Sequence, residues 1–76
     1  MGLEFYIMLN AYWEPLDFEL PAPTEPDRGP WRRWIDTGLE SPQDIVPWEA
    51  APGIFSDAYR ADARSVVVLF NIGGNR

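Results

Sequence analysis

The stretch Arg64–Asn71, with the sequence RSVVVLFN, decides the fold of this chain. It holds a run of five apolar residues, three valines followed by Leu69 and Phe70, without Gly or Pro. A run this short predicts a β-strand rather than a helix. Successive side chains of a strand point to opposite faces of the sheet, so both faces of this strand are apolar. Because a small two-layer fold easily covers only one face, we expect a covering layer from outside the chain.

A second strand is predicted over Glu4–Asn10, EFYIMLN, which is also apolar on both sides. Its two faces carry Phe5, Ile7 and Leu9 on one side and Tyr6 and Met8 on the other. A strand with this pattern is expected to be a central strand of the sheet and a natural neighbour of Ser65–Asn71. Their pairing brings the two ends of the chain together.

Two shorter strands complete this half of the prediction. Leu16–Leu20 alternates apolar and acidic residues, which is typical of an antiparallel strand with one face on the core. We expect this strand, with Leu16, Phe18 and Leu20 inward, to form a hairpin with the first strand. Ala58–Ala61 is expected to form a last short strand that leads into the closing strand as another hairpin.

The middle of the chain is less regular. Trp31–Thr37, WRRWIDT, is predicted as a strand with Trp31 and Ile35 facing inward. Before it, Pro21–Pro30 contains four prolines and a glycine, a composition that favours an extended surface connection. After it, Gly38–Ser56 is a long proline-containing loop, in which Ser41–Asp44 (SPQD) is compatible with one helical turn.

These elements define an all-β chain: a small antiparallel β-sandwich or sheet of about five or more short strands with long proline-rich loops. Residues 1–72 are expected to form a single domain, because 76 residues support one domain at most. Residues 73–76 are expected to be a frayed tail.

Composition excludes several classes of function. The chain has no cysteine and no histidine, which removes disulfides, cysteine zinc sites and every Ser-His or Cys-His catalytic pair. We predict no metal and no cofactor. A net charge of −6 argues against nucleic acid as a partner, and no apolar run approaches the roughly 20 residues of a membrane span. The lack of cysteine fits a cytoplasmic location.

Three segments in order carry a resemblance to a known family: FYIMLNAYWEPLDFELP (Phe5–Pro21), WRRWIDT (Trp31–Thr37) and YRADARSVVVLF (Tyr59–Phe70). Together they resemble the C-terminal β-domain of isoamylase-type glycogen debranching enzymes, glycoside hydrolases of the α-amylase clan. The resemblance spans nearly the whole chain. It implies that residues 1–72 are a C-terminal accessory domain of a larger parent enzyme.

The resemblance also implies the parent's activity and architecture. The parent would hydrolyse α-1,6 branch linkages of glycogen or its limit dextrins in a (β/α)₈ barrel, and the β-domain would pack on that barrel as its partner. The barrel's nucleophile and acid/base motifs have no counterpart in this chain, so no catalytic residue is expected here. Related sequences often carry histidine in the turn after the first strand, where this chain has Tyr12 and Trp13.

Exposed aromatic side chains are the candidate contacts for an α-glucan or for the barrel. Sugar rings stack on indole rings, and a turn or a long loop tends to expose them. The candidates are Tyr12 and Trp13 in the turn, and Trp48 in the loop. The alternative is that these side chains cap the core or contact the missing barrel, whereas Trp31 and Trp34, within a strand, are expected to pack.

Charged residues are expected to be solvated rather than catalytic. A glycosidase needs two carboxylates in a cleft, and such pairs are offered by Asp17 with Glu19 and by Asp57 with Asp62. A chain of this size does not build both a core and a deep cleft. The basic residues Arg28, Arg32 and Arg33 are likewise expected to form a solvated rim.

Three functional hypotheses follow. The first is a non-catalytic domain that packs on and stabilises the barrel of a debranching hydrolase. The second is an independent carbohydrate-binding module that uses Trp13, Trp48 and Tyr12. The third is a small adaptor that dimerises through its apolar face.

Overall fold

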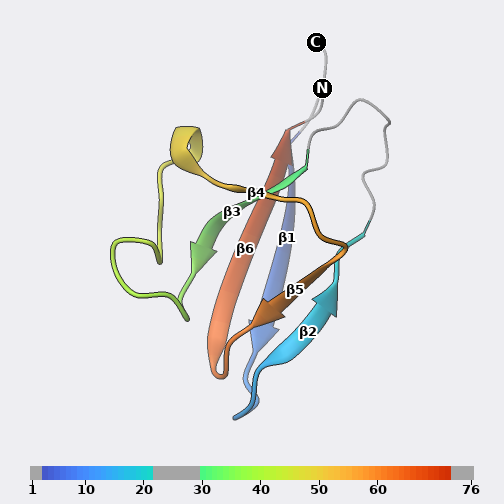
Figure 1. Ribbon diagram of the computed structural model, residues 1–76, viewed down its shortest axis with the longest axis vertical. Helices are drawn as coiled ribbons and strands as arrows, with labels where there is room; N and C mark the ends of the chain where they lie inside the picture. The colour runs from blue at the N-terminus through green and yellow to red at the C-terminus, as the bar shows by residue number, and fades with distance from the viewer. Residues whose placement is uncertain (1–2, 22–29, 73–76) are drawn as a thin grey trace.

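The computed structural model describes residues 3–21 and 30–72 as an all-β fold (Figure 1). Six strands and one short 3₁₀ helix lie in the order β1 (Leu3–Asn10), β2 (Leu16–Glu19), β3 (Trp31–Asp36), η1 (Trp48–Ala50), β4 (Gly53–Ile54), β5 (Ala58–Ala61) and β6 (Ser65–Ile72). A four-stranded sheet has the order β1-β6-β3-β4, and a two-stranded sheet contains β2 and β5. All pairings are antiparallel. The predicted fold class is therefore confirmed.

The pairing of the first and last strands is also confirmed. β1 and β6 pair in an unbroken register that runs from Leu3 opposite Ile72 to Asn10 opposite Ser65. β6 lies in the middle of the larger sheet, between β1 and β3. Both edges of β6 are therefore paired, while its side chains alternate between the two faces of the sheet, with Val67 and Leu69 in the buried core.

Two predicted hairpins are wrong. β2 pairs with β5 instead of β1, and β5 does not pair with β6. The chain changes sheet at both places. Between β1 and β2, the buried Asn10 holds the turn by hydrogen bonds; before β6, Arg64 takes a left-handed conformation (φ 53°) at the bend. The short β2–β5 sheet is thereby placed over one face of the larger sheet.

The core lies between the two sheets. Its buried residues come from both layers and from the segments beside them: Met8, Leu20, Trp31, Ala61, Val67 and Leu69. Tyr6, Phe18, Ile54 and Tyr59 pack against this cluster. One face of β1 and β6 is therefore covered by the chain's own second layer. We call this the inner face of the larger sheet, and the opposite one the outer face.

A β-bulge in β3 corrects the predicted facing of that strand. Arg33 lies opposite Leu69, but the next paired residue is Ile35, opposite Val68, so one extra residue is inserted. An inserted residue shifts all following side chains to the other face. Trp31 is buried as predicted (7% exposed), whereas Ile35 shares the outer face with Val68.

The predicted long loop contains more structure than expected. Residues 41–44 form a turn, with a cis peptide bond between Ser41 and Pro42, and the helical turn lies further on, at η1. Ile45 forms an isolated bridge to Ile35, and β4 extends the sheet at its far edge. The connection over residues 22–29 and the predicted tail over 73–76 lie outside the described residues. Within the described residues, no helix has the length and apolar character needed to cross a membrane.

Candidate interaction face

The outer face of the larger sheet is built from alternate residues of β1 and β6. Phe5 lies opposite Phe70, and Ile7 lies opposite Val68. The row through Val68 continues to Ile35 on β3 and, through the isolated bridge, to Ile45. Directly opposite residues of antiparallel strands point to the same face, so an aliphatic row crosses the whole sheet.

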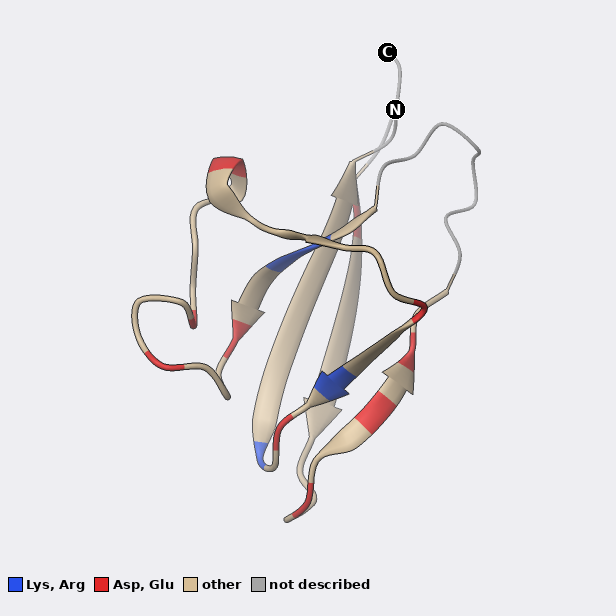
Figure 2. Cartoon of the chain, in the orientation of Figure 1, with Lys and Arg blue, Asp and Glu red and all other residues tan. Residues whose placement is uncertain are grey.

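Six large apolar residues of this face are exposed. The exposed fractions are 45% for Leu3, 47% for Phe5, 65% for Ile7, 68% for Leu9, 59% for Ile45 and 54% for Ile72. A large apolar residue presents on the order of 200 Å² when fully exposed, so these six leave roughly 680 Å² uncovered, slightly more than the largest patch of a typical monomer. Figure 2 shows that β6 carries no charge along its length.

Trp48 covers one corner of the face. Its ring stacks on Phe70 at 4.6 Å between centroids, meets Trp34 edge-on at 5.4 Å and lies 6.2 Å from Phe5. Phe70 is therefore 1% exposed, and Trp48 itself remains 38% exposed. The long loop therefore buries Phe70 through Trp48 and leaves Ile7 and Leu9, further along β1, exposed.

Tyr12 and Trp13 form a separate aromatic pair in the β1–β2 turn. They are 48% and 63% exposed, and their ring centroids lie 5.5 Å apart. The turn lies at the opposite end of β1 from the corner that Trp48 covers (Figure 1). The structure therefore does not bring all three predicted contact residues together. Trp13 and Trp48 are exposed as expected, and Trp31 is buried.

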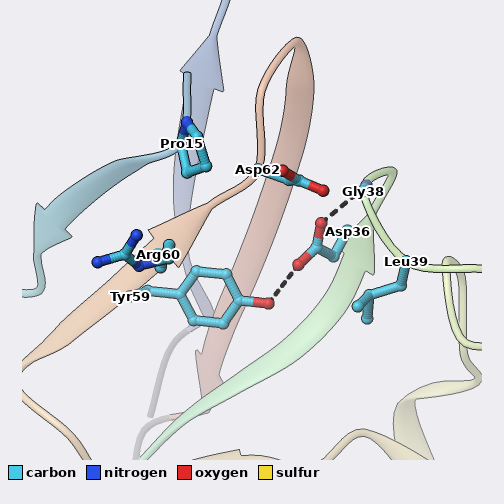
Figure 3. Close-up of a pocket in the computed structure, with 7 residues that line it drawn as sticks. All are labelled: Pro15, Asp36, Gly38, Leu39, Tyr59, Arg60 and Asp62. Atoms are coloured by element: carbon cyan, nitrogen blue, oxygen red, sulfur yellow. Dashed lines mark hydrogen bonds between the residues drawn. The ribbon is translucent and has the colours of Figure 1, made fainter. Parts of the chain in front are cut away.

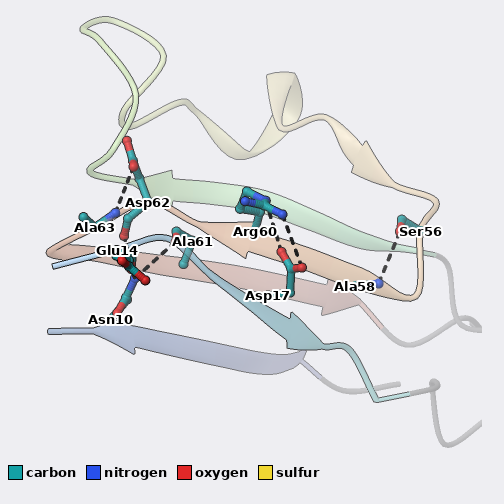
Figure 4. Close-up of polar contacts among 9 residues, drawn as sticks. All are labelled: Asn10, Glu14, Asp17, Ser56, Ala58, Arg60, Ala61, Asp62 and Ala63. Carbon is teal, nitrogen blue, oxygen red and sulfur yellow. Dashed lines mark hydrogen bonds and ion pairs between the residues drawn. The ribbon is translucent and has the colours of Figure 1, made fainter. Parts of the chain in front are cut away.

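Asn10 fixes this aromatic turn, a role that the sequence did not reveal. Its side-chain Oδ1 accepts the backbone N–H of Tyr12 at 3.0 Å. Its Nδ2 donates to the carbonyl oxygens of Glu14 at 2.9 Å, Ala61 at 3.2 Å and Asp62 at 2.9 Å (Figure 4). Asn10 is 1% exposed, so it ties the two chain reversals together from inside the fold. The only available signal was a polar residue at the end of an apolar strand.

A second polar site joins the two sheets around Asp36. One oxygen of this buried carboxylate accepts the N–H of Gly38 at 2.9 Å, and the other accepts the hydroxyl of Tyr59. The adjacent pocket of about 230 Å³ is lined by Asp36, Tyr59, Arg60 and Asp62 among others (Figure 3). Burial, followed by the hydrogen bond to Asp36 and its charge, raises the pKa of Tyr59 to about 12. Since both oxygens of Asp36 are engaged, this site holds the fold together.

The two predicted acidic pairs, Asp17 with Glu19 and Asp57 with Asp62, are on the surface. Asp17 forms an ion pair with Arg60 at 3.1 Å across β2 and β5, and both side chains are more than 60% exposed. Glu19 and Asp57 are exposed as well. Arg32 donates to the carbonyl of Ala51 at 3.1 Å, while the predicted rim residue Arg28 lies outside the described residues. Among the described residues, no group of acidic side chains is arranged to hold a metal ion.

These features define a small all-β domain with one uncovered apolar face. Comparison with known proteins finds a relative among the isoamylases. The chain is 38% identical over 68 residues to isoamylase 3, chloroplastic, of rice (Oryza sativa subsp. japonica), a match that covers 90% of the chain and 8% of the relative. This similarity supports a relation to the isoamylase family, in which the chain spans a small part of a much longer protein. No protein-family model matches the chain, and no solved structure matches it.

Proposed function

We propose that this chain is a non-catalytic β-domain of a debranching glycoside hydrolase and packs through its outer face on the parent's catalytic (β/α)₈ barrel. The observation that carries the proposal is the uncovered row on β1, where Ile7 and Leu9 are 65% and 68% exposed. The similarity to an isoamylase supports the choice of parent, since the matched segment is 8% of that relative. The parent's substrate would be the α-1,6 branch linkage of glycogen or limit dextrin.

The physical reason for packing is the hydrophobic effect. Fully burying a Leu or Ile side chain contributes roughly 1.5–3 kcal/mol relative to leaving it exposed. Packing within one polypeptide avoids most of the entropy that two free molecules lose on association. Several half-exposed aliphatic residues on one face are therefore enough to hold a domain against its neighbour.

The test uses the parent enzyme with Ile7→Ser and Leu9→Ser combined. We expect its melting temperature to fall by several degrees before activity at low temperature changes, because the substituted face loses its apolar contact. The matched control is Phe55→Ser, which removes an 87% exposed aromatic residue of the β4–β5 connection, outside the outer face. A parent that keeps full stability with both outer-face substitutions would overturn the proposal.

A second candidate function, binding of an α-glucan, is favoured by one observation. The Tyr12–Trp13 pair is exposed and its turn is held rigid by Asn10. Preorganised aromatic rings lose little conformational entropy on binding. Titration of the chain with maltoheptaose or glycogen, followed by Trp fluorescence, should then saturate and disappear in Trp13→Ala. Because Trp48 is stacked on Phe70, Trp48→Ala should retain the response.

The third candidate, a dimerising adaptor, makes a different prediction for the isolated chain. Face-to-face association would cover the same aliphatic row in two copies. Sedimentation equilibrium would then show a dimer whose population rises with concentration and falls in Ile7→Ser. We rank this below packing on the barrel, because each copy carries a net charge of −6 and like charges oppose association.

A further inference from the structure

β1 has a free edge as well as a free face. It is the first strand in the sheet order β1-β6-β3-β4, so among the described residues no strand pairs with its outer side. Edge strands are normally kept short, charged or interrupted by proline or a bulge, because they invite pairing with another chain. The opposite edge strand, β4, follows this rule with two residues directly after Pro52.

β1 lacks most of these protective features. It is eight residues long, contains no proline or glycine, and pairs with β6 without a bulge. Its only charged residue is Glu4. A long, regular, apolar edge of this kind is typical of a strand that has a partner on each side.

The hydrogen bonds of the sheet show which backbone groups face this edge. Thr37 donates its N–H to the carbonyl of Val66 at 3.0 Å, and Val66 donates its N–H to Oγ1 of Thr37 at 2.9 Å. The main chain of Val66 therefore points toward β3. Main-chain groups alternate in direction along a strand, so the even-numbered residues of β6 face β3 and the odd-numbered ones face β1.

The β1–β6 register then fixes the direction of each residue in β1. The odd-numbered residues of β6 lie opposite even-numbered residues of β1, whose main chain consequently points inward to β6. The residues whose N–H and C=O groups point outward are Leu3, Phe5, Ile7 and Leu9. These are also the residues whose side chains lie exposed on the outer face. A partner strand would therefore meet outward-pointing backbone groups and exposed apolar side chains of the same residues.

We propose that the free edge of β1 accepts one further β-strand: an extended segment of the same parent polypeptide, outside these 76 residues, with apolar side chains on both faces. Such strand addition uses main-chain hydrogen bonds for affinity and alternate side chains for fit. The assignment of this strand to the parent polypeptide rests on the proposed function, whereas the unpaired edge of β1 is observed in the sheet order. Figure 1 shows β2 displaced past β1 on the side away from β6, so the added strand would run beneath β2.

The apolar character expected of this strand follows from its neighbours on each face. On its outer side it would extend the row that contains Ile7 and Leu9. On its inner side it would meet β2, where Leu16 is 41% exposed and Phe18 is half-buried. A second copy of the chain fits the edge less well. Pairing β1 with itself around a two-fold axis would set two uncovered outer faces side by side and bring together two net charges of −6.

Amide hydrogen exchange tests the proposal without any substitution. In the isolated chain at low concentration, the amides of Phe5, Ile7 and Leu9 should exchange fast, while those of Tyr6 and Met8, which face β6, are protected. In the parent, the three outward amides should slow by on the order of a hundredfold or more, as expected for amides that enter a stable ladder. Fast exchange in both proteins would overturn the proposal, and so would protection in the isolated chain that rises with concentration, which would assign the edge to a second copy.

Two substitutions at one position separate the edge from the face. Ile7→Ala removes outer-face contacts but keeps the N–H group, whereas Ile7→Pro also removes that outward donor, which an unpaired edge tolerates. The two variants should differ little in the isolated chain. In the parent, Ile7→Pro should unfold at a clearly lower temperature than Ile7→Ala. Equal melting of both variants in the parent contradicts strand addition, yet leaves packing of the face on the barrel intact.

Discussion

Phe5 and Phe70 lie directly opposite each other on β1 and β6, yet Phe5 is 47% exposed and Phe70 is 1% exposed. The difference comes from Trp48, whose ring stacks on Phe70 at a centroid distance of 4.6 Å and an angle of 19°. Phe5 and Phe70 therefore differ in burial because Trp48 stacks on Phe70 and only borders Phe5, at 6.2 Å between centroids, and because β6 has a strand on each side whereas β1 is an edge strand. The long loop therefore covers the outer face at Phe70 and leaves Ile7 and Leu9 of the same face exposed.

Trp48→Ala should open this corner. The substitution removes ring contacts to Phe70 and Trp34 and exposes Phe70 to water. Because Trp48 is already 38% exposed, we expect a loss of about 2 kcal/mol in the free energy of unfolding, below the usual cost of truncating a fully buried aromatic residue. Urea unfolding of the isolated chain measures it. Trp13→Ala, which removes a 63% exposed ring, is the matched control and should cost less than about 0.5 kcal/mol.

Asn10→Asp should destabilise the chain more than Asn10→Ala. The side-chain Nδ2 faces three carbonyl oxygens, so a carboxylate at this position would lose the donors and place a negative charge against acceptors. Leaving buried carbonyls unpaired costs about 1–3 kcal/mol, and more when a charge is involved. Unfolding in urea at pH 7 ranks the variants. If aspartate proved as stable as asparagine, the proposed role of Asn10 in joining the two turns would be wrong.

The sequence predicted which segments form strands better than it predicted which strands pair with each other. The two-sided apolar pattern of β1 and β6 identified both strands and their pairing. It placed β6 correctly in the middle of the sheet, but the central position predicted for β1 is wrong, because β1 lies at the edge. The one-sided alternation of Leu16–Leu20 gave the inward face, but alternation does not say which strand lies alongside. The prediction consequently paired β2 with β1, whereas the structure pairs it with β5.

The candidate site depended on tertiary contacts that no local pattern encodes. A single inserted residue in β3 moved Ile35 to the outer face, and period-2 reasoning has no means of locating such a bulge. The stacking of Trp48 on Phe70 joins residues 22 positions apart. Exposure of Trp13 was predictable, because it lies in a turn, two residues before Pro15, where few neighbours can cover it. The hydrogen bonds of Asn10 were not, since they converge from two distant reversals of the chain.

Tyr59 should make the chain sensitive to alkaline pH. Its pKa in the folded state is about 12, above the ordinary value of 10.0, so the folded state holds the phenolic proton more tightly than the unfolded state does. The resulting stability is fully present below pH 10.0 and is lost as the pH rises through about 12. Because Tyr59 is partly exposed, screening reduces the effect to about 1 kcal/mol.

The matched variant for this test is Tyr59→Phe, which keeps the ring and removes the hydroxyl donor to Asp36. It should be less stable than the natural chain at pH 7, and the gap between the two should narrow between pH 10.0 and about 12. Urea midpoints measured across this range give the gap directly. A constant gap would show that the Tyr59 hydroxyl does not titrate differently in the folded state.

Gly38 should not tolerate a side chain. A Cβ atom at this position would lie 2.7 Å from Cβ of Asp62 and 3.2 Å from Oδ1 of Asp36, and contacts this close force the backbone to move. Oδ1 of Asp36 also accepts the Gly38 N–H, so a shift of Gly38 loosens the buried carboxylate. We expect Gly38→Ala to cost about 1–3 kcal/mol, measured as a lower urea midpoint. Gly53→Ala is the control, because its one close contact would be the far edge of the exposed Phe55 ring at 3.1 Å, which can rotate away, while Cγ of Pro30 at 3.4 Å is at ordinary contact distance. An equal loss in both variants would contradict this assignment of strain to the Asp36 site.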